Sequence, residues 1–226
     1  MTPPRRPRPR APAGPRLPPS LTEATLAEHD LADEATLYQL AVALDLSGRT
    51  ARLVEIEQCR FQDADLSGTT LTRAGLRDCA VTRANLANLH AEQSSLVRAQ
   101  LSGCRLTGLH WLDGSLREVR FSQCRADLAV FRFSNFRQVR FERCNLTRAD
   151  FQDAELGGAE FVDCDLSGAQ FSSARMRGTR FHGCVLSGIG GVGSFDGAVI
   201  AAADLLALSY PMAAALGIQV EDPDGG

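Results

Sequence analysis

The sequence predicts an all-β solenoid, a chain wound into four-sided coils, on three observations. From Leu46 to Leu186 every fifth residue is apolar, without an insertion or a deletion. Two residues before each of these centres stands a small side chain, such as Cys59 or Ala64. Phenylalanine recurs among the centres at multiples of 20 residues in two sets, which are Phe61, Phe121, Phe141, Phe161 and Phe181, and Phe131, Phe151 and Phe171.

Each five-residue unit reads as one short edge and one corner. Two inward positions separated by one outward residue fit extended chain, because successive side chains of a strand point to opposite sides. The remaining positions carry turn-forming pairs, as in Ser67-Gly68 and Ser167-Gly168. A helix is excluded, because positions five apart rotate by about 140° around it and the apolar set would spread over all sides.

The two phenylalanine sets are offset by ten residues, and leucine fills the centres between them. Only Phe136 departs from this order. The true period is therefore 20 residues, or four edges per coil, which is typical of a solenoid. Strands of adjacent coils should lie about 4.8 Å apart, so the repeat predicts a rod of roughly 35 Å in which identical side chains stack.

The amino-terminal part of the chain divides into two segments before the repeat at 46–190. Residues 1–20 hold eight of the ten prolines and five arginines but no acid, a composition that predicts a disordered tail. Residues 21–45 form an N-terminal cap or a degenerate first coil. Leu21, Leu26 and Leu31 keep the five-residue phase, whereas Thr36 to Leu44 fits a short helix equally well.

Residues 191–226 are expected to form a C-terminal helix cap and tail. Ala201 to Leu216 has a helical apolar period, Pro211 should kink or restart the helix, and Gly217 fits its end. Ile218 to Val220 is expected to return as a short strand. A cap is required because the end of a solenoid exposes strand edges. The apolar side chains for capping, or for pairing two chains, are Leu205, Leu208, Met212 and Leu216.

The residues that usually carry chemistry do not form a catalytic or metal-binding pattern. The seven cysteines all occupy the small inward position, which predicts buried free thiols. His90 and His110 are 20 residues apart and should stack on one outer wall as a solvated pair. We therefore expect no enzyme activity, no metal and no cofactor. No apolar run is long enough to cross a bilayer and no secretory signal is recognisable, so a cytoplasmic location is expected.

Two surface features stand out along the repeat. Ala126 to Phe136 places apolar Val130 and Phe133 at normally outward positions, which indicates either a contact patch or a local bulge that buries them. The second feature is a basic belt of Arg117, Arg120, Arg125, Arg132, Arg137, Arg140, Arg143 and Arg148.

An acidic belt follows the basic one at Asp150, Asp153, Glu155, Glu160, Asp163 and Asp165. Together with Asp45 and Asp65 it is the predicted acidic docking face. Arg140 and Glu160 share a column and could simply pair across coils, a contact worth under about 1 kcal/mol at a surface. The alternative is electrostatic docking of a partner with the opposite charge pattern.

The chain resembles the pentapeptide repeat family, whose unit runs small residue, Asp or Asn, Leu or Phe, then two polar residues. The matching segments are Ala64-Asp65-Leu66-Ser67-Gly68, Ala84-Asn85-Leu86, Cys144-Asn145-Leu146-Thr147-Arg148, Ala149-Asp150-Phe151-Gln152-Asp153 and Cys164-Asp165-Leu166-Ser167-Gly168. The resemblance implies a right-handed quadrilateral β-helix, with the C-terminal helix as its cap.

Local matches resemble the actinobacterial fluoroquinolone-resistance branch of this family, whose members interact with DNA gyrase. They are Leu128-Ala129-Val130-Phe131, Asn135-Phe136, Cys144-Asn145-Leu146 and Ala213-Ala214-Ala215-Leu216-Gly217. The resemblance implies a DNA-mimicking binder and protector of DNA gyrase or topoisomerase IV, active as a homodimer joined at the C-terminal ends. Direct nucleic-acid binding is not expected.

The net charge departs from that branch. Residues 46–189 carry 19 arginines and 16 acids, a net charge of +3, whereas a duplex mimic should be strongly negative. The alternative is a generic protein–protein interaction scaffold for another partner.

Overall fold

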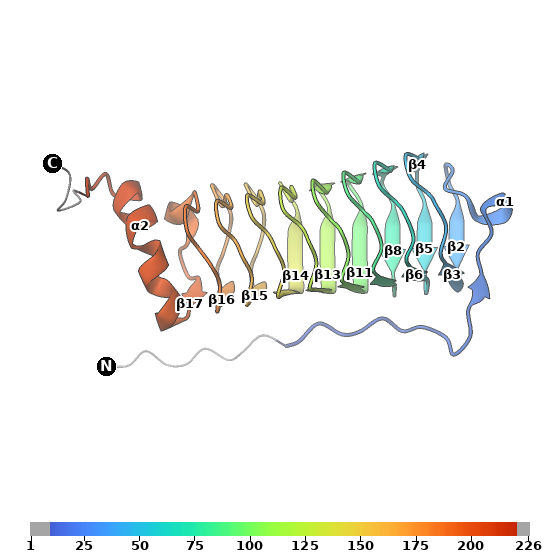
Figure 1. The fold of residues 1–226 in the computed structure, drawn as a ribbon, viewed down its shortest axis with the longest axis horizontal. Coiled ribbons are helices and arrows are strands. Elements are labelled where there is room, and N and C mark those ends of the chain that lie inside the picture. The colour runs from blue at the N-terminus through green and yellow to red at the C-terminus, as the bar shows by residue number, and fades with distance from the viewer. Residues whose placement is uncertain (1–9, 221–226) are drawn as a thin grey trace.

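The computed structural model describes residues 10–220, and these form a β-solenoid with a helical C-terminal end (Figure 1). The strands are β1 (Thr22–Glu23), β2 (Thr36–Tyr38), β3 (Leu40–Val42), β4 (Thr50–Arg52), β5 (Glu55–Glu57), β6 (Arg60–Gln62), β7 (Thr70–Thr72), β8 (Gly75–Arg77), β9 (Ala80–Thr82), β10 (His90–Glu92), β11 (Ser95–Ser102), β12 (His110–Leu112), β13 (Ser115–Ser122), β14 (Asn135–Glu142), β15 (Glu160–Val162), β16 (Arg180–His182) and β17 (Val199–Ile200). The helices are α1 (Leu26–His29), η1 (Val192–Ser194), η2 (Ala202–Leu208) and α2 (Ser209–Ala215).

The coils have four faces, named here by their apolar centres. The first face runs from Leu46 to Leu186, the second from Ala51 to Phe171, the third from Ile56 to Met176 and the fourth from Phe61 to Phe181. All strand pairs are parallel, and throughout the repeat each residue pairs with the one 20 positions later, as His90 does with His110. The third and fourth faces share one sheet with the long strands β11, β13 and β14, whereas the second face is the sheet β12-β10-β7-β4. The first face is joined by isolated bridges.

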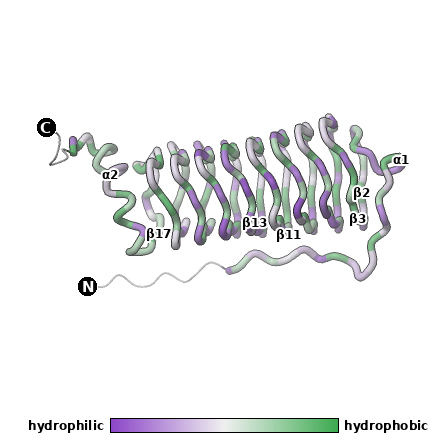
Figure 2. Tube along the Cα trace, in the orientation of Figure 1, coloured by the Kyte–Doolittle hydropathy of each residue, from purple (hydrophilic) through white to green (hydrophobic). Residues whose placement is uncertain are grey.

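The inward side chains stack as the period predicts. The rings of Phe121 and Phe141 are 4.6 Å apart between centroids, and those of Phe141 and Phe161 are 5.2 Å apart and nearly parallel. Phe136 adds an edge contact with Phe131 at 5.7 Å. Figure 2 shows the resulting alternation of hydrophobic and hydrophilic residues around each coil.

The coils nearer the amino end mostly carry alanine, valine or leucine at the centres where later coils carry phenylalanine, and a cavity of about 40 Å³ remains there. Its lining is entirely apolar and includes Val81, Leu101, Trp111 and Phe121. All seven cysteines are buried and free. Burial raises the pKa of the Cys79 thiol to about 12, which is the behaviour of an inert filler.

The corner of each unit lies in the left-handed backbone region, even where the residue is not glycine. Phe133 and Leu128 have φ of 59° and 60°. Such a conformation is uncommon for bulky residues, and here the hydrogen bonds of the neighbouring coils hold it. Phe133, for example, donates its backbone N–H to the carbonyl of Gln152.

Strands also lie on both sides of the 46–190 repeat. β2 and β3 pair with β5 and β6, but with an offset of 19 residues, because the first coil is one residue shorter. Residues 36–42 are therefore strands, and the helix considered for Thr36 to Leu44 is wrong, since the one helix of that region is α1. The division of the chain at residues 20, 45 and 190 stays a prediction.

The C-terminal end begins with β17, which pairs with β16 and is followed by η2 and α2. The predicted restart near Pro211 is present: α2 begins at Ser209, so Pro211 lies in its first turn, where a missing N–H costs little. Ile218 to Val220 form no strand, which corrects the expectation for that segment. No helix of the described residues is long and apolar enough to span a membrane.

Residues 10–20 have no helix or strand, and they run back along the coils in extended form (Figure 1). The predicted disorder of the tail falls partly on residues 1–9, which lie outside the described residues.

Candidate partner-docking surfaces

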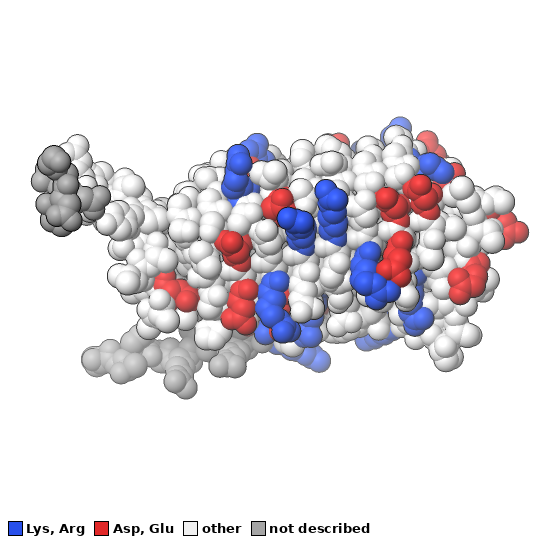
Figure 3. Space-filling view, in the orientation of Figure 1, with Lys and Arg blue, Asp and Glu red and all other residues white. Residues whose placement is uncertain are grey.

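The outer column of the first face carries its charges in blocks: two acids, then two arginines, then one acid, with asparagines between the blocks. Its bridged residues, one per coil, are Asp45, Asp65, Asn85, Arg105, Arg125, Asn145, Asp165 and Val185. The next outward position along this face is small in most coils, as at Ser47, Ser67 and Ser167, so the wall is flat. Figure 3 shows acidic and basic side chains alternating along the rod instead of forming one acidic surface.

Three of the eight residues predicted to form the acidic docking face are in ion pairs with arginine. Arg132 and Asp150 approach to 2.6 Å, Arg175 and Glu155 to 2.6 Å, and Arg140 and Glu160 to 3.1 Å. The pairing of Arg140 with Glu160 across coils is therefore present, as the column order allowed. These pairs neutralise much of the middle of the acidic belt.

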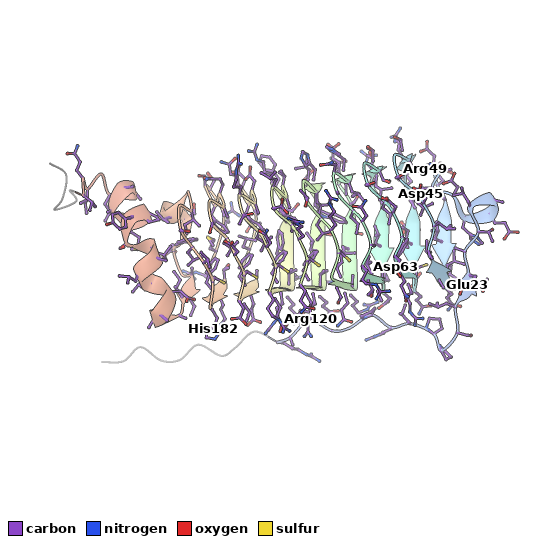
Figure 4. All side chains as sticks on the ribbon, viewed as in Figure 1. Glu23, Asp45, Arg49, Asp63, Arg120 and His182 are labelled. Atoms are coloured by element: carbon purple, nitrogen blue, oxygen red, sulfur yellow. The ribbon has the colours of Figure 1, made fainter. Side chains whose placement is uncertain are left out.

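The other five of the eight predicted docking carboxylates have no ion pair with the described residues, and they are Asp45, Asp65, Asp153, Asp163 and Asp165. Figure 4 shows Asp45 and Asp63 toward the amino end of the rod. Hydrogen bonds from the side chain and the backbone of Ser47 hold the pKa of Asp45 below its usual value, and Ser67 does the same for Asp65. Asp45 and Asp65 therefore remain charged well below neutral pH.

The basic belt encircles the rod and does not form one patch. Arg117 lies over Arg137 on the third face, and Arg120 lies over Arg140 on the fourth. Arg125, Arg132, Arg143 and Arg148 lie on the first and second faces or at their corners. Arg143 pairs with Glu142 at 3.3 Å and Arg125 with Asp127 at 3.6 Å.

The coil from Ala126 to Phe136 keeps its register, so no bulge buries its outward apolar residues. Val130 bridges both His110 and Asp150 in the ordinary spacing. Phe133 is 59% exposed and Leu128 is 44% exposed. Of the two alternatives that the sequence left open, the structure has the exposed apolar patch.

His90 and His110 stack on the second face, with ring centroids 4.3 Å apart. Burial, and then the charges of His90 and Arg132, lower the pKa of His110. No group of three or more potential metal ligands comes together within residues 10–220. The pair is therefore a surface contact on an outer wall.

The four apolar residues of the C-terminal end do not share one environment. Leu208 is buried against the end of the solenoid, whereas Leu205, Met212 and Leu216 are exposed. Exposed Leu206 and Tyr210 extend the same end surface. Leu208 therefore acts in the cap, and the other three remain available to a second molecule.

Sequence reasoning missed one buried charge, the carboxylate of Asp78 at the corner between the third and fourth faces. Arg98 donates from Nε and Nη2 to its two oxygens at 2.8 and 2.7 Å, and the backbone N–H of Arg16 donates to Oδ1 at 3.0 Å. Burial raises the pKa of Asp78, but the hydrogen bonds from Arg98 and Arg16 outweigh burial and leave the pKa below its usual value. No motif marks this position, because other coils place Gln58 and Arg98 at the same corner.

The geometry defines a β-solenoid built from five-residue units that present outward side chains on four flat walls. The chain belongs to the pentapeptide repeat family: the pattern described as the pentapeptide repeat region matches residues 54–131, 94–171 and 134–190. No curated protein matches the chain.

Solved structures with a similar fold include other proteins of five-residue repeats. Full-length QnrB1, described as a plasmid-mediated fluoroquinolone resistance protein, is 20% identical over 80% of this chain and 98% of its own, with a TM-score of 0.36. HetL from the cyanobacterium Nostoc sp. strain PCC 7120, described as involved in heterocyst differentiation regulation, is 20% identical over 72% of this chain and 87% of its own, with a TM-score of 0.32. These likenesses concern the fold alone.

Proposed function

We propose that the chain is a non-catalytic binding protein, and that DNA gyrase or a related type II topoisomerase is the partner to test first. The observation that carries this proposal is the outer column of the first face, where Asp45 and Asp65 present stacked carboxylates with no ion pair on a flat wall of small residues. Stacked carboxylates on a rigid rod suit a protein surface that otherwise receives a nucleic-acid backbone.

The local resemblance to the actinobacterial fluoroquinolone-resistance branch points to the same partner. It rests on Leu128-Ala129-Val130-Phe131, on Asn135-Phe136 and on the alanine-rich end of α2. Arg105 and Arg125 interrupt the acidic column in the middle, so a duplex-like surface is limited to its two ends.

The test is a supercoiling assay with purified gyrase, with and without a quinolone, together with direct binding at micromolar protein. We expect the wild type to inhibit gyrase or to protect it from the quinolone. The double variant Asp45→Arg/Asp65→Arg should lose this effect. The matched control is Asp150→Asn, because that carboxylate already pairs with Arg132 and should contribute less. Absence of binding, inhibition and protection by the wild type would eliminate the topoisomerase.

The second candidate is an interaction scaffold for a different protein. The first face carries both an acidic and a basic block, and this mixture favours a scaffold. A partner with the complementary order of charges would match the surface better than a protein site that receives DNA. Under this alternative, reversing Arg105 and Arg125 to Asp should weaken binding of the true partner, whereas the same change should strengthen binding to gyrase.

A further inference from the structure

The amino-terminal segment lies on the solenoid with a regular period. Pro12, Pro15 and Pro18 are each half-buried, as is Leu17, whereas Ala13, Gly14 and Arg16 are exposed. A period of three residues is that of a polyproline II helix, which turns one side toward a surface at every third position. The rod therefore contacts one side of a proline-rich extended segment.

Two ion pairs of the same design show what this segment does to the surface beneath it. Asp63 and Arg83 pair at the corner between the fourth and first faces, with the same two distances of 2.8 and 2.7 Å as Asp78 and Arg98. The Asp63 side chain is 54% exposed, but the Asp78 side chain is only 4% exposed. The additional feature at Asp78 is the tail, which hydrogen-bonds to it.

The contact has the components of a peptide site. A buried carboxylate accepts a backbone N–H from the extended segment, and it is held in place by a bidentate arginine. A backbone N–H can be supplied by any residue except proline. The site would therefore select an extended chain with this spacing of prolines and would not depend on the side chain of the donor residue. Its anchor to the tail is a single hydrogen bond among the described contacts, so the segment can be exchanged.

We propose that the corner between the third and fourth faces is a docking surface for proline-rich, extended peptides, and that residues 12–18 occupy it in cis as a displaceable strap. The Asp78 carboxylate is its polar anchor, and the prolines supply the apolar contacts. An external proline-rich segment binds only when the strap gives way, because a tethered occupant competes at high effective concentration.

The first experiment uses the full chain and a fluorescent peptide with the sequence of residues 10–20. Replacing Pro12, Pro15 and Pro18 by Ser in the protein weakens the strap and leaves every residue of the solenoid unchanged. We expect this variant to bind the peptide at least ten-fold more tightly than the wild type does. Equal binding of the peptide and of a scrambled peptide to the variant would overturn the proposal.

The anchor is tested in the same strap-weakened background. Asp78→Asn should weaken peptide binding at least ten-fold, and the matched change Asp63→Asn should leave it unchanged. Equal effects of the two changes would refute a specific anchor. Circular dichroism checks that both variants keep the solenoid.

A second measurement does not depend on changing the solenoid. In the wild type the amide of Arg16 should exchange with solvent at least ten-fold more slowly than in the free peptide, independent of protein concentration. Arg16→Pro removes the donor within the tail alone, and it should let the protein bind the peptide more tightly, as the serine variant does. Exchange of the Arg16 amide at the rate of the free peptide would rule out the strap. Protection of this amide that rises with protein concentration would show that the tail binds a second copy of the chain, which would also overturn the strap in cis.

Discussion

Two phenylalanines show how strongly the energetic role of one residue type depends on its position. Phe161 is fully buried between Phe141 and Phe181, whereas Phe133 is exposed at a corner. Phe161→Ala should lower the free energy of unfolding by about 3–5 kcal/mol, because it removes a stacked ring and leaves a cavity. Phe133→Ala should change it by less than about 0.5 kcal/mol. Urea unfolding of both variants measures the difference, and equal losses would contradict the stacked core.

His110 predicts a dependence of stability on pH. Burial, His90 and Arg132 lower its pKa in the folded state, so the folded protein binds a proton less readily than the unfolded chain. This contribution to stability is present above the unfolded pKa of about 6.5 and is lost as the pH falls through the folded pKa. The free energy of unfolding of the wild type should therefore fall more between pH 7.5 and 5.5 than that of His110→Gln. Parallel pH profiles would show that folding does not lower the pKa of His110.

At the scale of the elements, the fourth face has an interrupted stack that can be completed. Leu101 lies between Val81 and Phe121 and lines the apolar cavity. Leu101→Phe should extend the aromatic column and raise the free energy of unfolding by about 0.5–2 kcal/mol, as cavity filling commonly does.

The matched control is Leu146→Phe on the first face, where the side chain is fully buried and does not line that cavity. Overpacking there should cost about 1–3 kcal/mol. Thermal unfolding compares the two variants. If both substitutions destabilise the protein equally, the cavity is not available to a larger side chain.

The elements that the sequence predicted are those whose cause is local and repeated. The inward positions of each five-residue unit are recognisable from its own apolar and small residues. The four faces, the columns and the corner geometry therefore follow from the period. The first coil was ambiguous because it is one residue short, which breaks the phase between β3 and β6. The contact of Arg16 with Asp78 was not predictable, because it uses a backbone N–H and joins residues 62 positions apart. Likewise, the sequence placed charges in columns but could not show which carboxylates pair with arginine.

For the molecule as a whole, a solenoid must close both ends, and the two ends do so differently. At the amino end, α1 and the short strand β1 continue the coil, and the chain then folds back along the rod. At the carboxyl end, η2 and α2 close the rod but leave several apolar side chains exposed. An exposed apolar surface at one end of a rod is suited to a second copy, since an isologous contact buries the same surface twice.

The homodimer that the family resemblance implies gives a prediction with an internal control. Leu205→Asp and Met212→Asp, at exposed positions of this end, should each reduce the mass in light scattering from two chains to one of 24.3 kDa without lowering the thermal unfolding temperature of the solenoid. Leu208→Asp should instead destabilise the cap, because it places a charge at a buried position. A wild-type mass of one chain at micromolar concentration would refute the dimer, and the exposed side chains would then have to contact a different protein.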